Sequence, residues 1–335
     1  MKLKGSIDRD KQGVVKPLQL LASSLLLYIL SLLFLIIPAD TYASTEDKKI
    51  LIVYQKAHGF SQQLIDYIQE DVSAKGFQVN HLIIKPQLET GRLNRIKINQ
   101  HQLLISIGSN TTKKLLEAEI NKPILSALVP RHIANSLKEA YPEKKNWSSL
   151  LIDQPVERQF HLISAIFGPH KNTGILVGPY TDDLKKALTK ASTKLEQHIQ
   201  TDKIESSDQL SASLKALSYS VDLLLTLPDP VIYNKSTIRG ILLLAYRNKL
   251  PIIGFSQAYV KAGAIAAIYS KPEQVSNQLT NIIEYFFTKH SFEQPVYYPE
   301  KFSVALNKNI ARSLGIKLAT KKSILDQIIK AEKNK

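Results

Sequence analysis

Residues 221–270, VDLLLTLPDPVIYNKSTIRGILLLAYRNKLPIIGFSQAYVKAGAIAAIYS, decide the fold. Three short apolar runs cover residues 221–227, 250–255 and 264–269, and a helical pattern separates the first two runs. Short, wholly apolar strands that alternate with helices are typical of a parallel sheet covered on both faces. The stretch therefore predicts half of a parallel α/β domain.

Polar side chains follow the ends of these predicted strands. Ligands of open parallel sheets bind beyond the carboxyl ends of the strands. The residues at that position are Asp229, Tyr233, Asn234, Ser256 and Gln257. We therefore expect them to take part in a ligand site.

The remainder of the chain repeats the same alternation. Apolar runs at 50–54, 77–84, 103–107 and 123–129 predict four strands with helices between them, which is enough for one lobe. After Trp147 a second series begins, with strands expected at 173–178 and 198–205. Residues 221–270 complete this second lobe.

The sequence thus predicts an α/β protein of two Rossmann-like lobes, each a mostly parallel sheet flanked by helices, with a ligand cleft between them. The lobes are expected to join near Asp153-Gln154-Pro155. We assign residues 48–152 plus about 271–295 to lobe 1, and residues 153–270 plus about 296–335 to lobe 2. Ser270 and Glu273 have the spacing of a capping box, which predicts a helix start there.

Residues 1–43 have the pattern of an export leader. Five basic residues precede an uncharged apolar run at 18–37, and Thr41-Tyr42-Ala43 forms a cleavage site before Ser44. The run has the length of a membrane-spanning helix, so a retained transmembrane anchor is the alternative to a cleaved signal peptide. Both interpretations place the rest of the chain in the periplasm, free or tethered to the inner membrane.

Composition excludes several classes of protein. The chain has no cysteine, so it has no disulfide, no thiolate metal site and no lipid anchor on an N-terminal cysteine. Its net charge of +15 is scattered over predicted helix faces and the tail, without a basic motif interleaved with aromatic residues. We expect no nucleic-acid partner.

No cofactor or metal site is expected either. The eight histidines show no metal-ligand spacing, and no G-x-G-x-x-G motif is present.

An ordered series of segments resembles the ABC-transporter substrate-binding protein family, which has the type I periplasmic-binding-protein fold and includes tryptophan-binding members. The segments lie at 103–130, 174–180, 221–229, 250–264 and 305–315. The resemblance implies an exported protein, not an enzyme, that closes on a small molecule by hinge motion. It also implies three crossings between the lobes, expected near 151–154, 256–263 and 295–299.

The segment Gly108-Ser109-Asn110-Thr111-Thr112 joins a predicted strand to a helix. Its backbone N–H groups and hydroxyls suit a carboxylate or another anion, although Ser109 or Thr111 can instead cap the helix. We expect Ser109, Asn110 and Thr111 to face Asp229, Tyr233 and Ser256 across one cleft.

Asp229 stands between two prolines, which fix φ and remove backbone donors. Its carboxylate either caps the following helix or pairs with a ligand cation. Tyr180 and Tyr233 each follow a strand end, where a ring either stacks on a flat ligand or packs within the protein.

Three functions follow from these observations. The first is capture of a small molecule, such as an amino acid or small carboxylate, for an ABC permease. The second is a periplasmic sensor subunit that presents its ligand to a membrane receptor or histidine kinase. The third is a periplasmic serine hydrolase, because Gly254-Phe255-Ser256-Gln257-Ala258 resembles a nucleophile elbow that lacks its second glycine.

Overall fold

The computed structural model describes residues 48–85, 95–118 and 120–333. The predicted leader lies outside these residues, so its cleavage or retention stays a prediction. Within the described ranges no helix is long and apolar enough to cross a membrane.

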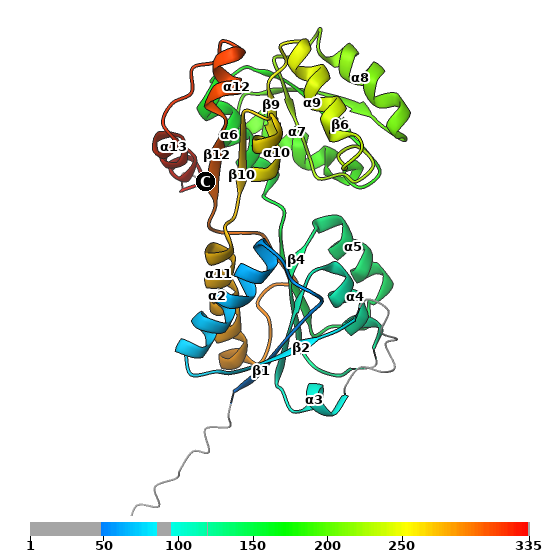
Figure 1. The fold of residues 1–335 in the computed structure, drawn as a ribbon, viewed down its shortest axis with the longest axis vertical. Coiled ribbons are helices and arrows are strands. Elements are labelled where there is room, and N and C mark those ends of the chain that lie inside the picture. The colour runs from blue at the N-terminus through cyan, green and yellow to red at the C-terminus, as the bar shows by residue number, and fades with distance from the viewer. Residues whose placement is uncertain (1–47, 86–94, 119, 334–335) are drawn as a thin grey trace, which may run out of the picture. The chain divides into compact units, whose positions relative to one another are not determined.

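The first lobe is built on a six-stranded parallel sheet in the order β11-β5-β4-β3-β1-β2 (Figure 1). Its strands are β1 Lys49–Tyr54, β2 Gln78–Ile83, β3 Leu103–Ile107, β4 Ile124–Val129, β5 Trp147–Leu151 and β11 Val296–Tyr297. Its helices are α2 Phe60–Ala74, α3 Arg95–Asn99, α4 Ser109–Glu117, α5 Arg131–Ala140 and α11 Pro272–Lys289.

The second lobe is built on a six-stranded sheet in the order β12-β10-β9-β8-β6-β7, in which only β12 runs antiparallel. Its strands are β6 Asn172–Val177, β7 His198–Lys203, β8 Leu223–Leu225, β9 Ile252–Gly254, β10 Ala266–Tyr269 and β12 Ser303–Leu306. Its helices are α6 Val156–Phe167, α7 Lys185–Lys194, α8 Leu210–Leu217, α9 Ile238–Arg247, α10 Gln257–Ala262, α12 Lys308–Ser313 and α13 Lys321–Lys333, with 3-10 turns η2 Asp182–Leu184 and η3 Ser207–Gln209.

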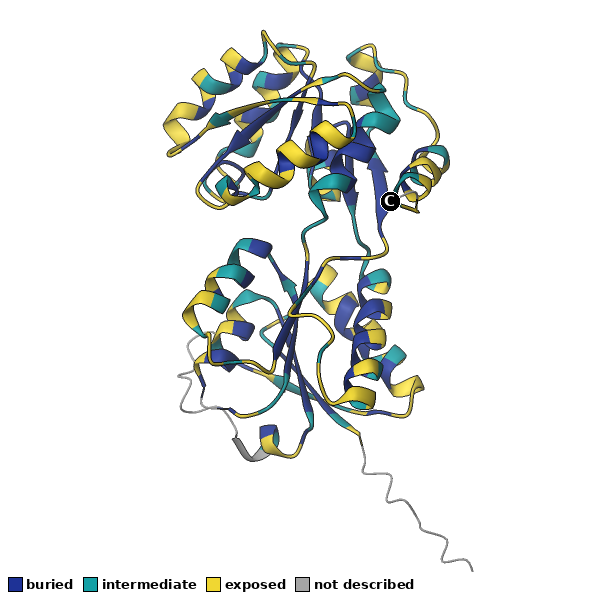
Figure 2. Cartoon of the chain, turned by 180° about the vertical axis from the view of Figure 1, so that it is seen from behind, coloured by how far each residue is buried: buried dark blue, intermediate teal, exposed yellow. Residues whose placement is uncertain are grey.

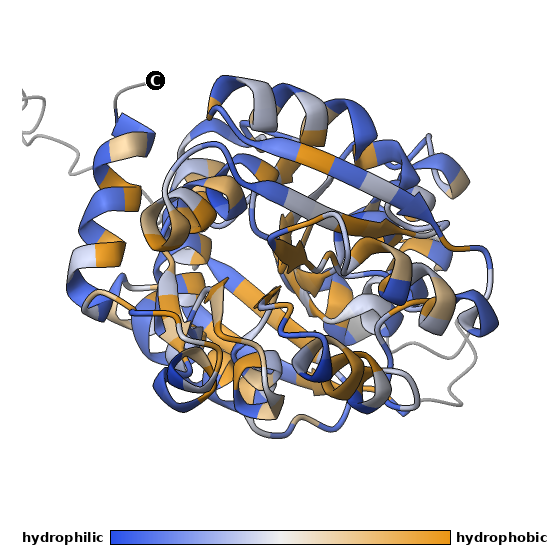
Figure 3. Cartoon of the chain, turned by 90° about the horizontal axis from the view of Figure 1, so that it is seen from above, coloured by the Kyte–Doolittle hydropathy of each residue, from blue (hydrophilic) through white to orange (hydrophobic). Residues whose placement is uncertain are grey.

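The central strands of both sheets are buried on their two faces, as the continuous apolar runs predict, whereas the edge strands β2 and β7 are partly exposed. In β1, Ile50 and Ile52 join one hydrophobic cluster while Leu51 and Val53 join another on the opposite face. The central strands are buried and hydrophobic, whereas the outward helix faces are exposed and hydrophilic (Figures 2 and 3).

The described chain crosses between the lobes three times, after β5, after β10 and after β11. The second crossing lies at Ser270–Lys271 rather than near 256–263, because residues 257–262 form α10 beside β10 of lobe 2. The third follows Tyr297, within the expected 295–299, and moves the lobe boundary assigned at about 295 by two residues, because β11 still pairs with β5.

The helix start after the second crossing also differs from the prediction. Helix α11 begins at Pro272, and the side-chain oxygen of Gln274 accepts the backbone N–H of Lys271 at 2.9 Å. Ser270 and Glu273 do not form the expected capping box. The Ser270 hydroxyl instead donates to the carbonyl of Lys301 at 2.7 Å, which joins the second crossing to the third.

One buried arginine, Arg158, connects the crossings to the first and the last helix of lobe 2, α6 and α13. Arg158 on α6 donates to Gln154 Oε1 at 2.8 Å and to the carbonyl of Pro299 at 2.7 Å. Its guanidinium also pairs with Glu332 on α13, with Nε 2.6 Å from Oε1. Gln154 in turn donates to Ser270 Oγ at 3.0 Å. We call Gln154, Arg158, Ser270 and Glu332 the hinge network.

We expect Arg158→Met to lower the free energy of unfolding by about 3 kcal/mol, because it leaves the carboxylate of Glu332 and the carbonyl of Pro299 without their buried cationic donor. Urea denaturation measures the loss. Arg239→Met, on the exposed side of α9, is the matched control and should change stability by less than about 0.5 kcal/mol. Equal effects of the two variants would contradict a structural role for the hinge network.

Candidate ligand-binding site

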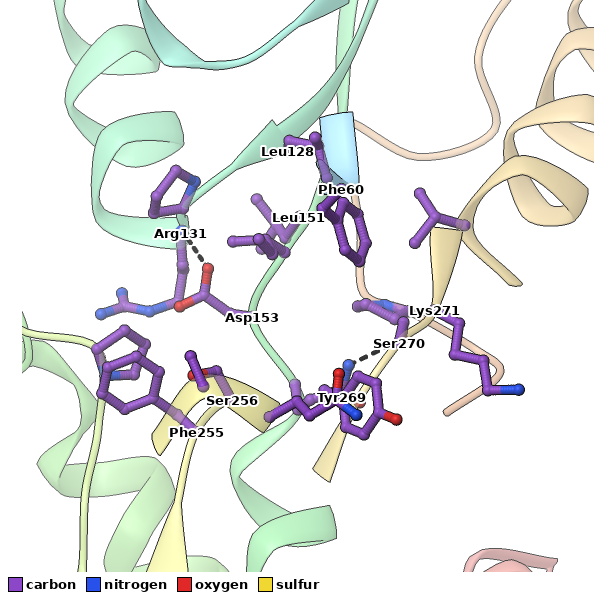
Figure 4. Close-up of a pocket in the computed structure, with 18 of the residues that line it drawn as sticks. Phe60, Leu128, Arg131, Leu151, Asp153, Phe255, Ser256, Tyr269, Ser270 and Lys271 are labelled. Atoms are coloured by element: carbon purple, nitrogen blue, oxygen red, sulfur yellow. Dashed lines mark hydrogen bonds between the residues drawn. The ribbon is translucent and has the colours of Figure 1, made fainter. Parts of the chain in front are cut away.

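A cavity of about 1130 Å³ opens between the carboxyl ends of the two sheets. Both lobes and all three crossings contribute residues to it, including Phe60, Leu128, Asp153, Phe255, Ser256 and Lys271 (Figure 4). We call this cavity the cleft. Its volume slightly exceeds the range usual for small-molecule sites.

The walls of the cleft are mainly apolar. Phe60 and Tyr67 come from α2 of the first lobe, and Phe255 follows β9 of the second. Leu128 lines the cleft from a bulge in β4, where its φ of 58° is uncommon for a residue with a side chain. Such a surface buries an apolar ligand body on two sides.

The residues predicted for the second lobe do line the cleft. They are Asp229, Tyr233, Asn234, Ser256 and Gln257. Tyr180 is not among the lining residues, although its ring packs against that of His132, a lining residue, at a centroid distance of 4.9 Å.

The structure does not bring Ser109, Asn110 and Thr111 into the cleft, so they do not lie opposite the second-lobe residues as expected. They form the first turn of α4, where Thr111 is buried. Pro130 after β4 and the first residues of α5, Arg131 and His132, line the cleft on the first-lobe side instead.

Asp229 is buried, and protein donors already occupy its carboxylate. Oδ2 accepts the backbone N–H of Tyr180 at 2.9 Å and the hydroxyl of Thr181 at 3.1 Å, and Oδ1 accepts the N–H of Val231 at 3.0 Å. The side chain therefore holds the loop after β6 against the loop after β8. These bonds favour a positioning role over pairing with a ligand cation.

Asn234 and Ser256 are also engaged locally. Asn234 Oδ1 accepts the N–H groups of Ser236 and Thr237, which forms a turn before α9. Ser256 caps α10 by accepting the N–H of Tyr259 at 3.4 Å. In the described part of the chain no histidine is hydrogen bonded to Ser256, so the hydrolase interpretation gains no support.

Two buried polar atoms in the cleft lining have no partner among the described residues. They are the Tyr233 hydroxyl and Gln159 Oε1, and the two side chains belong to residues that are 6% and 4% exposed. Burial raises the pKa of Tyr233, so its hydroxyl stays neutral. Buried polar groups are almost always hydrogen bonded, and an exception calls for an explanation such as an absent ligand.

Asp153 is the cleft carboxylate that the sequence interpretation used only as a lobe junction. It follows β5, and its Oδ2 accepts the backbone N–H of Arg131 at 2.7 Å (Figure 4). Burial raises the pKa of this carboxyl, against the smaller opposing effects of Arg131 and His132. It follows a strand end, as Asp229 does, but β5 was not among the strands predicted from the sequence, so this signal did not single out Asp153.

The guanidinium of Arg131 joins the lobes on one side of the cleft. It forms a bidentate pair with Asp183 of η2 and donates to the carbonyl of Tyr180 at 3.0 Å. The two parallel hydrogen bonds of a bidentate pair fix the orientation of the guanidinium in addition to pairing the charges. Arg131 is therefore engaged in this interlobe contact.

Several solved structures are similar to this chain in fold. A Streptococcus pneumoniae ABC domain in complex with L-Trp is 19% identical, with a TM-score of 0.57, over 84% of this chain and 98% of that one. A ligand-free, open substrate-binding protein with adhesive properties from Clostridium difficile is 16% identical, with a TM-score of 0.66, over 82% and 97%. A mutant XylFII–LytSN complex is 14% identical, with a TM-score of 0.55, over 79% and 99%.

These likenesses confirm the predicted fold class: two lobes of the type I periplasmic-binding-protein kind with a ligand cleft between them. The model of the ABC transporter substrate-binding protein family matches residues 48–329. The chain belongs to that family and is a ligand-binding protein of the solute-binding class. No curated protein matches the sequence significantly.

We expect Gly178→Ala to lower the free energy of unfolding by about 2 kcal/mol, because the added Cβ would lie 2.5 Å from Oδ2 of Asp229. Gly240→Ala is the matched control. Its Cβ meets nothing within 4 Å inside α9, so it should raise stability by about 0.5–1 kcal/mol. Thermal and urea unfolding of both variants measure the difference. A neutral Gly178→Ala would show that Asp229 does not need its close approach to the backbone.

Proposed function

We propose that this protein is an exported solute-binding protein that captures a small molecule in the cleft for an ABC importer. The observation that carries the proposal is the pair of unpartnered, buried polar atoms on Tyr233 and Gln159, two residues of the mainly apolar cleft lining. An unpaired buried polar group costs about 1–3 kcal/mol of stability. A ligand that hydrogen bonds to these atoms recovers that free energy on binding.

Family membership supports delivery to an ABC permease. The structural neighbour solved with L-Trp makes amino acids the first compounds to screen here. The neighbour named as a XylFII–LytSN complex keeps a sensor role as the alternative. Co-purification with an ABC permease, rather than with a membrane receptor, would separate import from sensing.

Export and localisation belong to the same proposal. The leader pattern at residues 1–43 supports secretion to the periplasm, either free after cleavage at Ala43 or tethered by residues 18–37. N-terminal sequencing of the periplasmic protein tests this, since a cleaved form begins at Ser44.

A thermal-shift screen of amino acids, amines and small carboxylates tests ligand capture directly. A ligand that binds only the folded state raises the melting temperature by mass action. Small-angle scattering with a compound found in the screen then tests hinge closure. Complete failure of a broad screen on the mature protein would contradict the proposal.

We expect Tyr233→Phe to separate binding from stability. Loss of the unpartnered hydroxyl should leave the free protein equally or more stable, while affinity for a ligand from the screen falls about fivefold, or about 1 kcal/mol. Calorimetry and thermal unfolding measure the two effects.

Tyr297→Phe is the matched control for this experiment. The Tyr297 hydroxyl accepts the backbone N–H of Gln294 at 3.1 Å and lies outside the cleft lining. Its removal should lower stability by about 1 kcal/mol and leave affinity unchanged. Unchanged affinity in Tyr233→Phe would remove Tyr233 from the ligand site.

A further inference from the structure

We propose that the cleft selects ligands by a protonated amine, which the Asp153 carboxylate and the Gln159 side-chain carbonyl accept, and that a ligand carboxylate is not required. This inference rests on the proposed function of ligand capture. It narrows the substrate class to organic amines with an apolar body.

The charged groups of the cleft favour a cation. Five acidic residues line it, against three basic ones, which leaves an excess of two acidic side chains. The acidic residues are Asp66, Glu70, Asp153, Asp229 and Glu273, and the basic residues are Arg131, Lys261 and Lys271.

Most of these groups already have protein partners. Arg131 pairs with Asp183, and Lys271 lies 3.3 Å from Glu273. Asp229 accepts three hydrogen bonds, as described above, while Lys261 is exposed on the last turn of α10. Asp153 differs from them, because burial raises the pKa of its carboxyl and, among the described residues, it forms no ion pair and accepts only backbone N–H groups, that of Arg131 at 2.7 Å.

A desolvated carboxylate gains more from a cation than an exposed one does, because the local dielectric constant is lower. Figure 4 shows Asp153 between Leu128 and Phe60 of the first lobe and Ser256 and Phe255 of the second. A cation at Asp153 therefore meets residues of both lobes. The body of such a ligand lies against the apolar walls.

Gln159 supplies the second, independent observation. Its unpartnered atom is Oε1, which only accepts hydrogen bonds. An ammonium group only donates, so the two are complementary, whereas a ligand carboxylate would place one acceptor against another. The Tyr233 hydroxyl both donates and accepts, so it does not discriminate between the two ligand classes.

One backbone N–H at each of three helix starts beside the cleft has an acceptor within the protein. The first N–H of α5 is given to Asp153, and an N–H in the first turn of α10 is given to Ser256. The N–H of Lys271 before α11 is given to Gln274. Helix starts are common anion sites, but these three have internal acceptors.

The test compares matched probes on the full mature protein. The probes are phenethylamine, phenylalanine and 3-phenylpropionate, together with tryptamine, tryptophan and indole-3-propionate, measured by calorimetry at neutral pH. We expect at least one amine to bind about 30-fold tighter than its matching acid, the factor expected for a charge pair in a desolvated site. Asp153→Asn should remove this preference, since its amide oxygen still accepts the N–H of Arg131 while the charge is lost.

Asp208→Asn, which removes the same charge from an exposed residue outside the cleft, should leave the preference intact. Acids that bind as tightly as the amines, amino acids that bind when the amines do not, or no amine binding at all would each overturn the inference. The proposed function is judged separately, because binding of an acid or of any compound in the wider screen supports ligand capture while the amine preference fails.

Discussion

The architecture depends on the hydrogen bonds of one buried guanidinium. Arg158 is buried in α6, so each N–H of its guanidinium needs an acceptor within the protein. These acceptors come from separate parts of the chain. One is on the first crossing, one on the third and one on the C-terminal helix α13. Because Gln154 and Ser270 extend the same network to the second crossing, the three connections between the lobes form one bonded unit. Separation of the crossings from one another would break these hydrogen bonds.

The need of buried polar groups for hydrogen-bond partners also explains why Asp229 and Asp153, two carboxylates of the cleft, are bonded differently. Asp229 lies where two loops present N–H groups and a hydroxyl, so its oxygens bond within the protein and connect the loops after β6 and β8. The absence of a side chain at Gly178 permits this approach. Asp153 lies at the junction of the lobes, where Arg131, the first residue of α5, donates its backbone N–H. Two aspartates that follow strand ends thus differ in how many internal hydrogen bonds they accept, because their local donors differ.

Periodicity predicted the lobes well, because continuous apolar runs such as Leu103–Ile107 have a single stable environment, the middle of a covered parallel sheet. It predicted the crossings less well. Residues 256–263 contain turn residues and a glycine, which fit both a crossing and a helix of six residues, and only the pairing of β9 with β10 decides for the helix. Val296–Tyr297 is too short to identify as a strand without its partner β5.

The candidate site, too, could be predicted from the sequence only in part. Strand ends predict which residues can reach a cleft, and Asp229, Tyr233 and Ser256 do line it. They do not predict which polar atoms stay unbonded, because that depends on donors and acceptors from distant segments. The Ser256 hydroxyl accepts the N–H of Tyr259, three residues away, whereas Oε1 of Gln159 on α6 has no hydrogen-bond partner among the described residues. The residues that are free to recognise a ligand are those that the folded chain leaves unsatisfied, and these are found only once every internal hydrogen bond has been assigned.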